Sequence, residues 1–135
     1  MNNIKYILVI NGFPTSGKTT FEKIIEEQYP SEIFSSISPI NELLLQIGWD
    51  GITKDDKYRN LACLLKDELT KFNDYSFNKV CEKIEEFKNN DKMFLMIDIR
   101  EPSEIKKLIH KYPDIITVFI CFCFTTNYHV RLIIV

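Results

Sequence analysis

The sequence predicts an α/β domain built on a mostly parallel β-sheet with helices covering both of its faces. Three almost continuously apolar runs, at residues 5–10, 92–99 and 115–122, carry this prediction. Strands that are apolar throughout are typical of parallel sheets buried on both faces. Amphipathic segments lie between the runs, and strands alternating with helices indicate a parallel sheet. At 135 residues, the chain is expected to form a single domain, 1–135.

The other elements are predicted from periodicity and from helix-boundary residues. They are a helix over 17–29, a short strand over 32–37, and helices over 39–48, 54–72, 77–88 and 102–112. Pro30 should stop the first helix, whereas Pro39 and Pro102 should begin two others. Ser76 is expected to be the N-cap of the helix over 77–88.

Two of these helices carry residues at three- and four-residue spacing that are expected to face the core. The stripes are Phe21, Ile24, Ile25 and Gln28 in the first helix, and Leu61, Leu64, Leu65 and Leu69 in the helix over 54–72.

The stretch NGFPTSGKTT, residues 11–20, follows the first apolar run and matches the spacing G-x-x-x-x-G-K-[ST]. Between a strand and a helix, this spacing predicts a nucleotide-phosphate site. Gly12 and Gly17 allow the backbone to approach a ligand closely, and the helix N-terminus attracts the anion. We expect Lys18 to reach the β and γ phosphates of ATP and the Thr19 hydroxyl to ligate Mg²⁺.

The loop also contains Pro14, which has no N–H to donate. The cradle is therefore expected to rely on donors from Thr15 to Thr19. The residues expected to bind the nucleotide are Gly12, Thr15, Ser16, Gly17, Lys18, Thr19 and Thr20. The alternative is a coincidental match in which the glycines only shape a turn.

Asp98 lies at the end of the second apolar run. Ligands of open α/β sheets bind outside the carboxyl ends of the strands, where Thr19 and Asp98 both fall. Asp98 is predicted to hold Mg²⁺, directly or through water, or to orient an acceptor oxygen; the alternative is a turn or helix-capping acid. Arg100 is predicted to clamp an acceptor phosphate, with pairing to Glu101 as its alternative.

Composition excludes several classes of partner. The net charge of −2 argues against a general nucleic-acid binder, which usually has a basic excess. The apolar run over 115–124 is about half the length of a membrane span. The four cysteines show no zinc or redox spacing, and the N-terminal residues show no cleavable signal. A reducing cytoplasm is the expected location.

Two motifs carry a family resemblance. GFPTSGKTT resembles the G-x-P-x-S-G-K loops of nucleotide kinases. IDIREPSEI, residues 97–105, resembles the D-x-R segment of deoxynucleoside monophosphate kinases and of the similar animal-type phosphomevalonate kinases. The resemblance implies the three-layer P-loop NTPase fold, with residues 31–90 as a helical acceptor-binding region inserted between strands. There it assigns the acceptor phosphate to Arg59, helped by Lys57.

The tail, residues 121–135, departs from that family. Such kinases carry a lid with arginines after the fourth strand, whereas this stretch has only Arg131 and ends in LIIV. We therefore expect an atypical tail and a C-terminally shortened fold. Either RLIIV, residues 131–135, forms the fifth strand directly, or the tail reflects a truncation or an altered reading frame.

These features favour an ATP- and Mg²⁺-dependent phosphotransferase that acts on a small phosphorylated acceptor, with a nucleoside monophosphate preferred. Lys18, Asp98 and Arg100 are the catalytic candidates, and Arg59, Lys57 and Arg100 are the acceptor ligands. A nucleotide-binding module with little transferase activity, regulatory or a truncated remnant, is the alternative. A structural or interaction domain with a coincidental loop is the third possibility.

Overall fold

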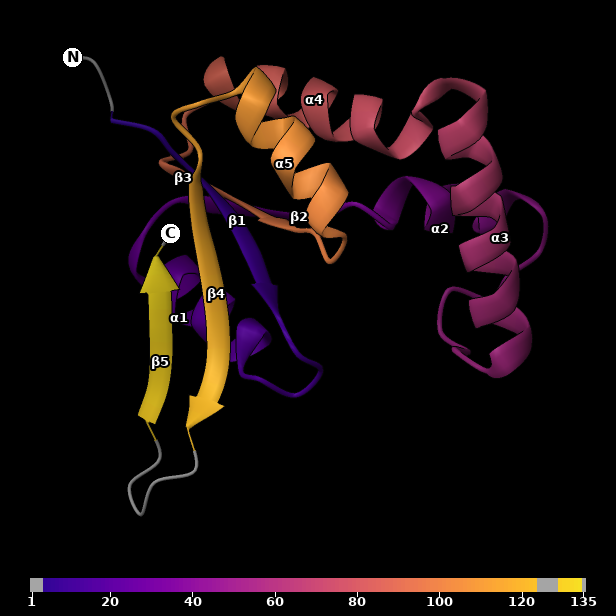
Figure 1. Ribbon diagram of the computed structural model, residues 1–135, viewed down its shortest axis with the longest axis horizontal. Coiled ribbons are helices and arrows are strands. Elements are labelled where there is room, and N and C mark those ends of the chain that lie inside the picture. Colours follow the sequence, from indigo (N-terminus) through magenta and orange to yellow (C-terminus); the bar gives the residue numbers. More distant parts are fainter. Residues whose placement is uncertain (1–3, 124–128, 135) are drawn as a thin grey trace.

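The computed structural model describes residues 4–123 and 129–134 (Figure 1). The elements in chain order are β1 (Tyr6–Gly12), α1 (Lys18–Gln28), β2 (Ser31–Ser35), α2 (Ser38–Gln46), α3 (Asp56–Asn73), α4 (Tyr75–Lys88), β3 (Phe94–Asp98), α5 (Pro102–Lys111), β4 (Ile116–Cys123) and β5 (His129–Ile134). Every helix and strand expected from the sequence is present, with its ends within two residues of their expected positions.

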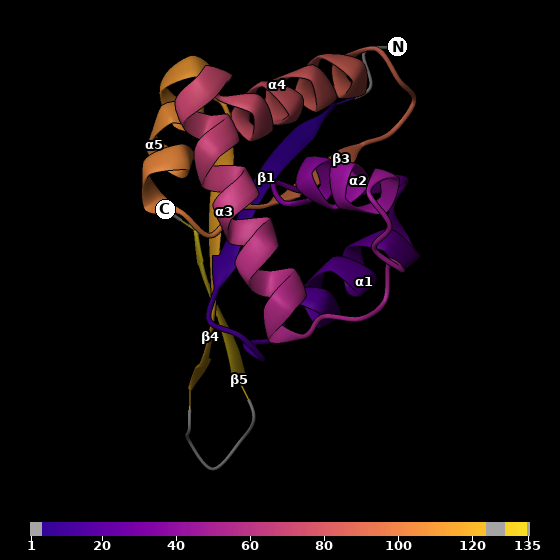
Figure 2. The ribbon, with the colours of Figure 1, turned by 90° about the vertical axis from the view of Figure 1, so that its right-hand side faces the viewer.

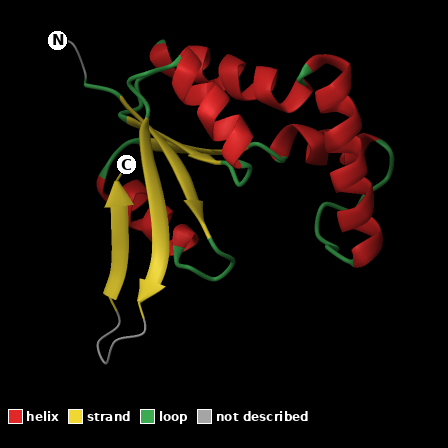
Figure 3. Ribbon diagram, viewed as in Figure 1, coloured by secondary structure: helices red, strands yellow, loops and turns green. Residues whose placement is uncertain are grey.

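The strands form one five-stranded sheet in the order β2-β3-β1-β4-β5 (Figure 3). β2, β3, β1 and β4 are parallel, and β5 pairs antiparallel with β4 at the edge. The predicted α/β fold with a mostly parallel sheet is therefore confirmed. β5 agrees with the alternative in which the end of the chain forms the fifth strand directly, although Val135 lies outside the described residues.

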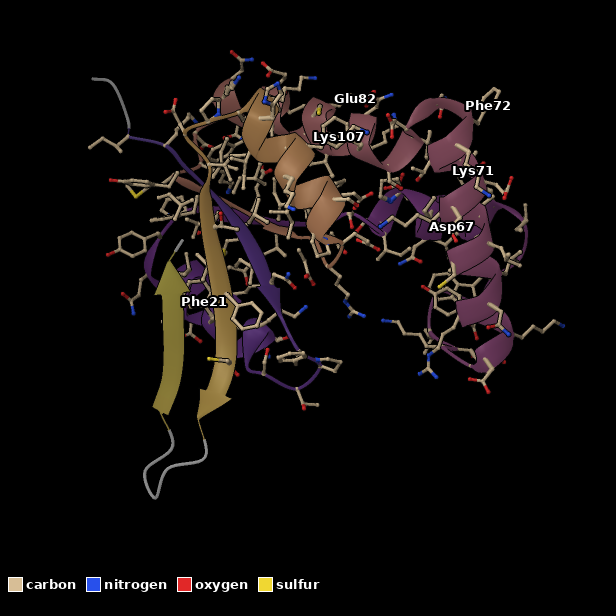
Figure 4. All side chains as sticks on the ribbon, in the orientation of Figure 1. Phe21, Asp67, Lys71, Phe72, Glu82 and Lys107 are labelled. Atoms are coloured by element: carbon tan, nitrogen blue, oxygen red, sulfur yellow. The ribbon has the colours of Figure 1, made fainter. Side chains whose placement is uncertain are left out.

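Helices cover both faces of the sheet, as Figures 1 and 2 show from two directions. α4 and α5 bury Ile84, Phe87 and Leu108 against one face. α1 packs Phe21, labelled in Figure 4, and Ile25 against the other. Helical layers on both faces explain why the central strands are apolar along their whole length.

A smaller cluster lies between α2 and α3. It is formed by Ile40, Leu44 and Ala62, with Trp49 and Tyr58 packed against it. α3 stands apart from the sheet in Figure 1, so the segment between β2 and β3 has its own small core.

Four residues expected to face the core are exposed. In α1 these are Ile24 and Gln28, whereas Glu22 is buried. In α3 they are Leu61 and Leu64, while the buried positions are Ala62 and Lys66, which is paired with acids at the start of α5. A helix that contacts its neighbours along a narrow line buries the residues on that line, whatever their polarity.

The expected N-cap of α4 is also wrong. Asp74 ends α3 in a left-handed conformation and directly begins α4, so the cap lies two residues earlier than expected. Ser76 is buried within the first turn of α4.

The cysteines differ in their exposure. Cys81 is buried, as expected of a small apolar residue, whereas Cys63 is exposed.

The sheet register determines which residues meet at the carboxyl edge. Asp98 of β3 lies opposite Ile10 of β1 on one side and Ser35 of β2 on the other. The loop after β1 and the end of β3 are therefore neighbours. None of the helices within the described residues is long and apolar enough to cross a membrane.

Candidate phosphate-binding site

The loop between β1 and α1 is tightly folded. A Cβ on Gly12 would lie 2.5 Å from the carbonyl oxygen of Ile120 and 2.7 Å from Ser16 Oγ, so no larger residue fits without a shift. Thr15 (φ 61°) and Gly17 (φ 96°) both adopt the left-handed conformation. For a β-branched threonine this costs about 1–3 kcal/mol, and such strain is concentrated at binding and active sites.

The loop presents hydrogen-bonding groups to a ligand. Gly17 is the N-cap of α1 and makes no side-chain cap, and the first N–H groups of a helix have no partners within it. The N–H of Ser16 is engaged, because it donates to Phe13 O at 3.1 Å. Ser16 Oγ is different: the residue is 3% exposed and this atom has no hydrogen-bond partner among the described residues. Of the donors expected from Thr15 to Thr19, the N–H of Ser16 is therefore already used within the loop. The Ser16 hydroxyl is an additional group that could hydrogen-bond to a ligand.

Lys18 and Asp98 come together over the loop. Lys18 Nζ donates to Asp98 Oδ1 at 3.0 Å, and both side chains are largely buried. They are 80 residues apart in the sequence. Thr19 and Thr20 lie exposed in the first turn of α1. The structure therefore places the lysine and the strand-end acid in direct contact.

Glu22 is a third charged group at this site, and the sequence analysis missed it. It is 8% exposed, and its Oε1 has no hydrogen-bond partner in the described part of the chain. Burial and then the charge of Asp98 raise the pKa of Glu22, while the charge of Lys18 opposes them. We call Lys18, Glu22 and Asp98 the phosphate-site triad. The available signal was helical spacing, since Glu22 is four residues after Lys18.

The oxygen atoms at and beside the phosphate-site triad suit Mg²⁺. No group of three or more His, Cys, Asp or Glu in residues 4–123 and 129–134 is arranged to hold a metal. Mg²⁺, however, usually keeps several waters and takes one or two carboxylates together with substrate phosphates. The Thr19 hydroxyl, the Asp98 carboxylate and the unpartnered Glu22 oxygen fit that pattern of donors.

The two residues of α3 that were predicted to bind the acceptor, Arg59 and Lys57, lie in different surroundings. The Arg59 side chain is 64% exposed and pairs weakly with Asp56 at 3.6 Å. Lys57 lines an open hollow of about 430 Å³ between α2 and α3. Beside Lys57, Trp49 and Tyr58 stack with their ring centroids 4.4 Å apart. Among the described residues, no hydrogen bond or ion pair joins Arg59 or Lys57 to the loop after β1, so their acceptor role stays a prediction.

A second triad, formed around the buried Lys66, links α3 to the start of α5. Lys66 Nζ lies 2.9 Å from Glu101 Oε1 and 3.3 Å from Glu104 Oε2. Burial would raise the pKa of Glu101, but the hydrogen bond and charge of Lys66 lower it overall. Burial raises the pKa of Glu104 despite the opposing charge of Lys66. We call Lys66, Glu101 and Glu104 the helix triad.

The helix triad bears on Arg100 and Arg59. Glu101 pairs with Lys66, so the alternative in which Glu101 pairs with Arg100 is wrong; Arg100 is exposed and has no ion pair among the described residues. Arg59, Ala62 and Lys66 are spaced i, i+3 and i+7 and therefore follow one face of α3. Arg59 therefore lies on the same face of α3 as Lys66, two turns nearer the start of the helix. This is the face from which Lys66 contacts Glu101, three residues after Asp98.

Comparisons with known proteins yield only distant structural likenesses. No family model matches the chain, and no curated protein matches it. A chain of the Pnkp1/Rnl/Hen1 complex aligns with 88% of this chain at 12% identity and a TM-score of 0.41. A chain of the Pnkp1/Rnl/Hen1 RNA repair complex aligns with 88% at 16% identity and a TM-score of 0.44. This chain spans 35% and 33% of those chains. A likeness at this level carries no information about function.

Proposed function

We propose that this chain is an ATP- and Mg²⁺-dependent phosphotransferase that acts on a small phosphorylated acceptor, with a nucleoside monophosphate preferred. The observation that carries the proposal is the contact between Lys18 Nζ and Asp98 Oδ1, 3.0 Å long, beside a strained glycine loop at a helix N-terminus. A lysine, a strand-end acid and free helix N–H groups are the parts that phosphoryl transfer requires. The proposed fold type is accordingly a P-loop kinase fold.

Lys18 has the central role in the proposed mechanism. In the structure its ammonium contacts the Asp98 carboxylate, which is its anionic partner. When ATP is present, the ammonium would contact the β and γ phosphates and stabilise the charge that develops during transfer. Thr19 and Asp98 would hold Mg²⁺, which when bound neutralises phosphate charge.

The reaction is an in-line displacement at the terminal phosphorus of ATP. An acceptor phosphate oxygen forms a new bond to that phosphorus, and the bond to the bridging oxygen breaks, so ADP leaves with the electron pair. The N–H groups of the loop and of the start of α1 hold the nucleotide so that its terminal phosphate stays in place. Arg100, Arg59 and Lys57 are the proposed acceptor ligands, because cations are required opposite an acceptor phosphate.

The test is ADP release in a coupled assay, with ATP, Mg²⁺ and a panel of nucleoside monophosphates as acceptors. Lys18→Ala should reduce transfer by a factor on the order of 10²–10³, as expected when one stabiliser of transition-state charge is removed. Lys23→Ala removes an exposed lysine from the same helix and should leave transfer unchanged. Equal activity of Lys18→Ala and the wild type would reject the proposed role of Lys18.

A nucleotide-binding module with little transfer is the second candidate. The segment between β4 and β5 has the sequence FTTNY, residues 124–128, with no arginine or lysine. The kinases that this sequence resembles carry lid arginines after this strand, and one such arginine is worth about 10³–10⁵ in rate. Binding of ATP and Mg²⁺ without transfer to any acceptor would favour this candidate.

Thermal unfolding separates both candidates from a structural or interaction domain. A ligand at 100 times its Kd should stabilise the folded chain by about 2.7 kcal/mol. Stabilisation by ATP and Mg²⁺ that Lys18→Ala abolishes is expected. Lack of stabilisation at millimolar nucleotide would contradict both nucleotide-binding candidates.

A further inference from the structure

Glu22 is a buried acid without a structural partner. It lies within α1, is 8% exposed, and its Oε1 accepts no hydrogen bond from the described residues. A buried carboxylate oxygen without a donor is costly, so its retention indicates a missing water, ion or ligand. Packing does not account for it either, because an apolar side chain would fill the same position without that cost.

The position of Glu22 points to the phosphate site. It is four residues after Lys18 and three after Thr19, so its side chain neighbours each of theirs on the surface of α1. The charges of Asp98 and Lys18 both act on Glu22, which places its carboxylate near the end of β3 as well as near the loop. Ser16 lies in the loop before α1, and its buried hydroxyl also has no hydrogen-bond partner among the described residues.

The charge of the phosphate-site triad is unbalanced. One ammonium faces two carboxylates, and Lys18 Nζ contacts only that of Asp98, at 3.0 Å. Glu22 therefore has an anionic oxygen available beside the residue expected to hold Mg²⁺. A hydrated divalent cation supplies what Glu22 lacks, namely positive charge and water O–H donors, because Mg²⁺ keeps several of its waters when it binds to a protein.

We infer that Glu22 belongs to the metal site as an outer carboxylate, which accepts hydrogen bonds from the hydration shell of a Mg²⁺ held by Thr19 and Asp98. This inference rests on the proposed nucleotide-binding function. Outer carboxylates of this kind orient the direct ligands and typically change metal affinity by about 10–100-fold when removed. Glu22 is thus a positioning residue: its expected contribution is to Mg²⁺ affinity, with only an indirect contribution to ATP affinity.

The experiment measures ATP binding by calorimetry over a range of Mg²⁺ concentrations. In the wild type, Mg²⁺ should increase the affinity for ATP. Glu22→Gln preserves the size of the side chain and should raise the Mg²⁺ concentration needed for half of that increase by about 10–100-fold. ATP affinity without Mg²⁺ should remain at or above the wild-type value, because one negative charge near the phosphates is lost.

Two variants complete the design. Glu27→Gln removes an exposed carboxylate from the same helix and should leave the Mg²⁺ requirement unchanged. Glu22→Asp keeps the charge on a shorter side chain and should lie between the wild type and Glu22→Gln. It also serves as the test variant if Glu22→Gln does not fold.

The outcomes are distinguishable. An unchanged Mg²⁺ requirement in Glu22→Gln, with the wild type still binding ATP and Mg²⁺ together, would overturn this inference and leave the proposed function intact. It would indicate that Glu22 is a protonated packing residue. Failure of the wild type to bind ATP at any Mg²⁺ concentration would overturn the proposed function and this inference together.

Discussion

The phosphate-site triad and the helix triad have the same composition, one lysine and two carboxylates, but different contacts. In the helix triad, Lys66 contacts both acids, at 2.9 Å and 3.3 Å. In the phosphate-site triad, Lys18 contacts Asp98 at 3.0 Å, and Glu22 Oε1 has no partner among the described residues. The helix triad is therefore complete, whereas the phosphate-site triad lacks a cation or a donor.

This difference indicates which of the two charged clusters stabilises the fold. A buried ion pair stabilises a fold only when its remaining hydrogen-bonding groups are satisfied. The helix triad meets this condition and connects α3 to α5. The phosphate-site triad does not meet it, and it lies beside a loop that also holds a left-handed threonine, Thr15. Unsatisfied charge and backbone strain in one place are typical of a ligand site.

The largest expected effect is on the stability provided by the helix triad. Lys66→Met leaves the largely buried Glu104 and the half-exposed Glu101 without their cation and should lower the free energy of unfolding by about 2 kcal/mol, measured by urea denaturation. Stabilisation by ATP and Mg²⁺ should persist. Lys71, labelled in Figure 4, is an exposed lysine paired with Glu68 on the same helix, so Lys71→Met should leave the stability almost unchanged.

The comparison would fail in either of two ways. Lys66→Met could prove as stable as the wild type, which would mean that the contacts of Lys66 do not stabilise the fold. Alternatively, Lys66→Met could lose the stabilisation by nucleotide while it remains folded, which would mean that the helix triad is part of the ligand site.

A smaller effect is expected where the face of α3 that carries Lys66 continues to Arg59. Arg59→Ala should raise the KM for the acceptor roughly tenfold, because one charge-assisted contact to phosphate contributes about 1.5 kcal/mol. The KM for ATP should not change. Stability should change little, since the pair of Arg59 with Asp56 is exposed.

Steady-state kinetics with each substrate varied in turn separates the two KM values. Lys71→Ala, at the other end of the same helix, is the matched control. An equal rise in both KM values, or none, would contradict the assignment of Arg59 to the acceptor.

The smallest expected effect concerns the pH dependence of the phosphate-site triad without Mg²⁺ or nucleotide. Burial, and then the charge of Asp98, raise the pKa of Glu22 above its ordinary value of 4.5. The folded state therefore binds this proton more tightly than the unfolded chain, and stability is lost as the pH rises from 4.5 through the raised value. Glu22→Gln has no such proton to lose.

Thermal unfolding between about pH 4 and pH 8 measures this difference. The wild type should lose stability relative to Glu22→Gln as the pH rises, and the difference should level off above the raised pKa. Glu27→Gln, with an exposed side chain changed, should stay parallel to the wild type. A wild type that gained stability relative to Glu22→Gln over this range would show that the pKa of Glu22 is lowered.

Much of the fold could be predicted, because the strands and helices follow from local patterns. The apolar runs indicated the parallel strands of the buried sheet, and the proline positions marked helix ends within two residues. The meeting of the glycine loop with Asp98 also followed, since parallel strands bring their carboxyl ends to one edge. The antiparallel pairing of β5 did not follow, because an apolar strand at a sheet edge can pair in either direction.

The surfaces of the helices could not be predicted from the same patterns. An apolar stripe was expected to face the core, yet Lys66 and Glu22 are buried while Leu64 and Ile24 are exposed. Lys66 is buried against a partner distant in the sequence, because Glu104 lies 38 residues after it. Glu22 is buried although its Oε1 has no hydrogen-bond partner among the described residues. The periodicity of one helix contains no information about which neighbour it will meet.

The sequence by itself therefore determined the order of strands and helices, the glycine loop after the first strand and the edge at which Asp98 lies. These depend on interactions within a few residues and on the rule that parallel strands end together. Only the tertiary structure decided that Lys18 contacts Asp98 while Glu22 Oε1 has no partner among the described residues, and that Lys66 contacts two acids. Such contacts depend on distances between helices and strands far apart in the chain, and at a buried site those distances decide whether a charge is satisfied or available.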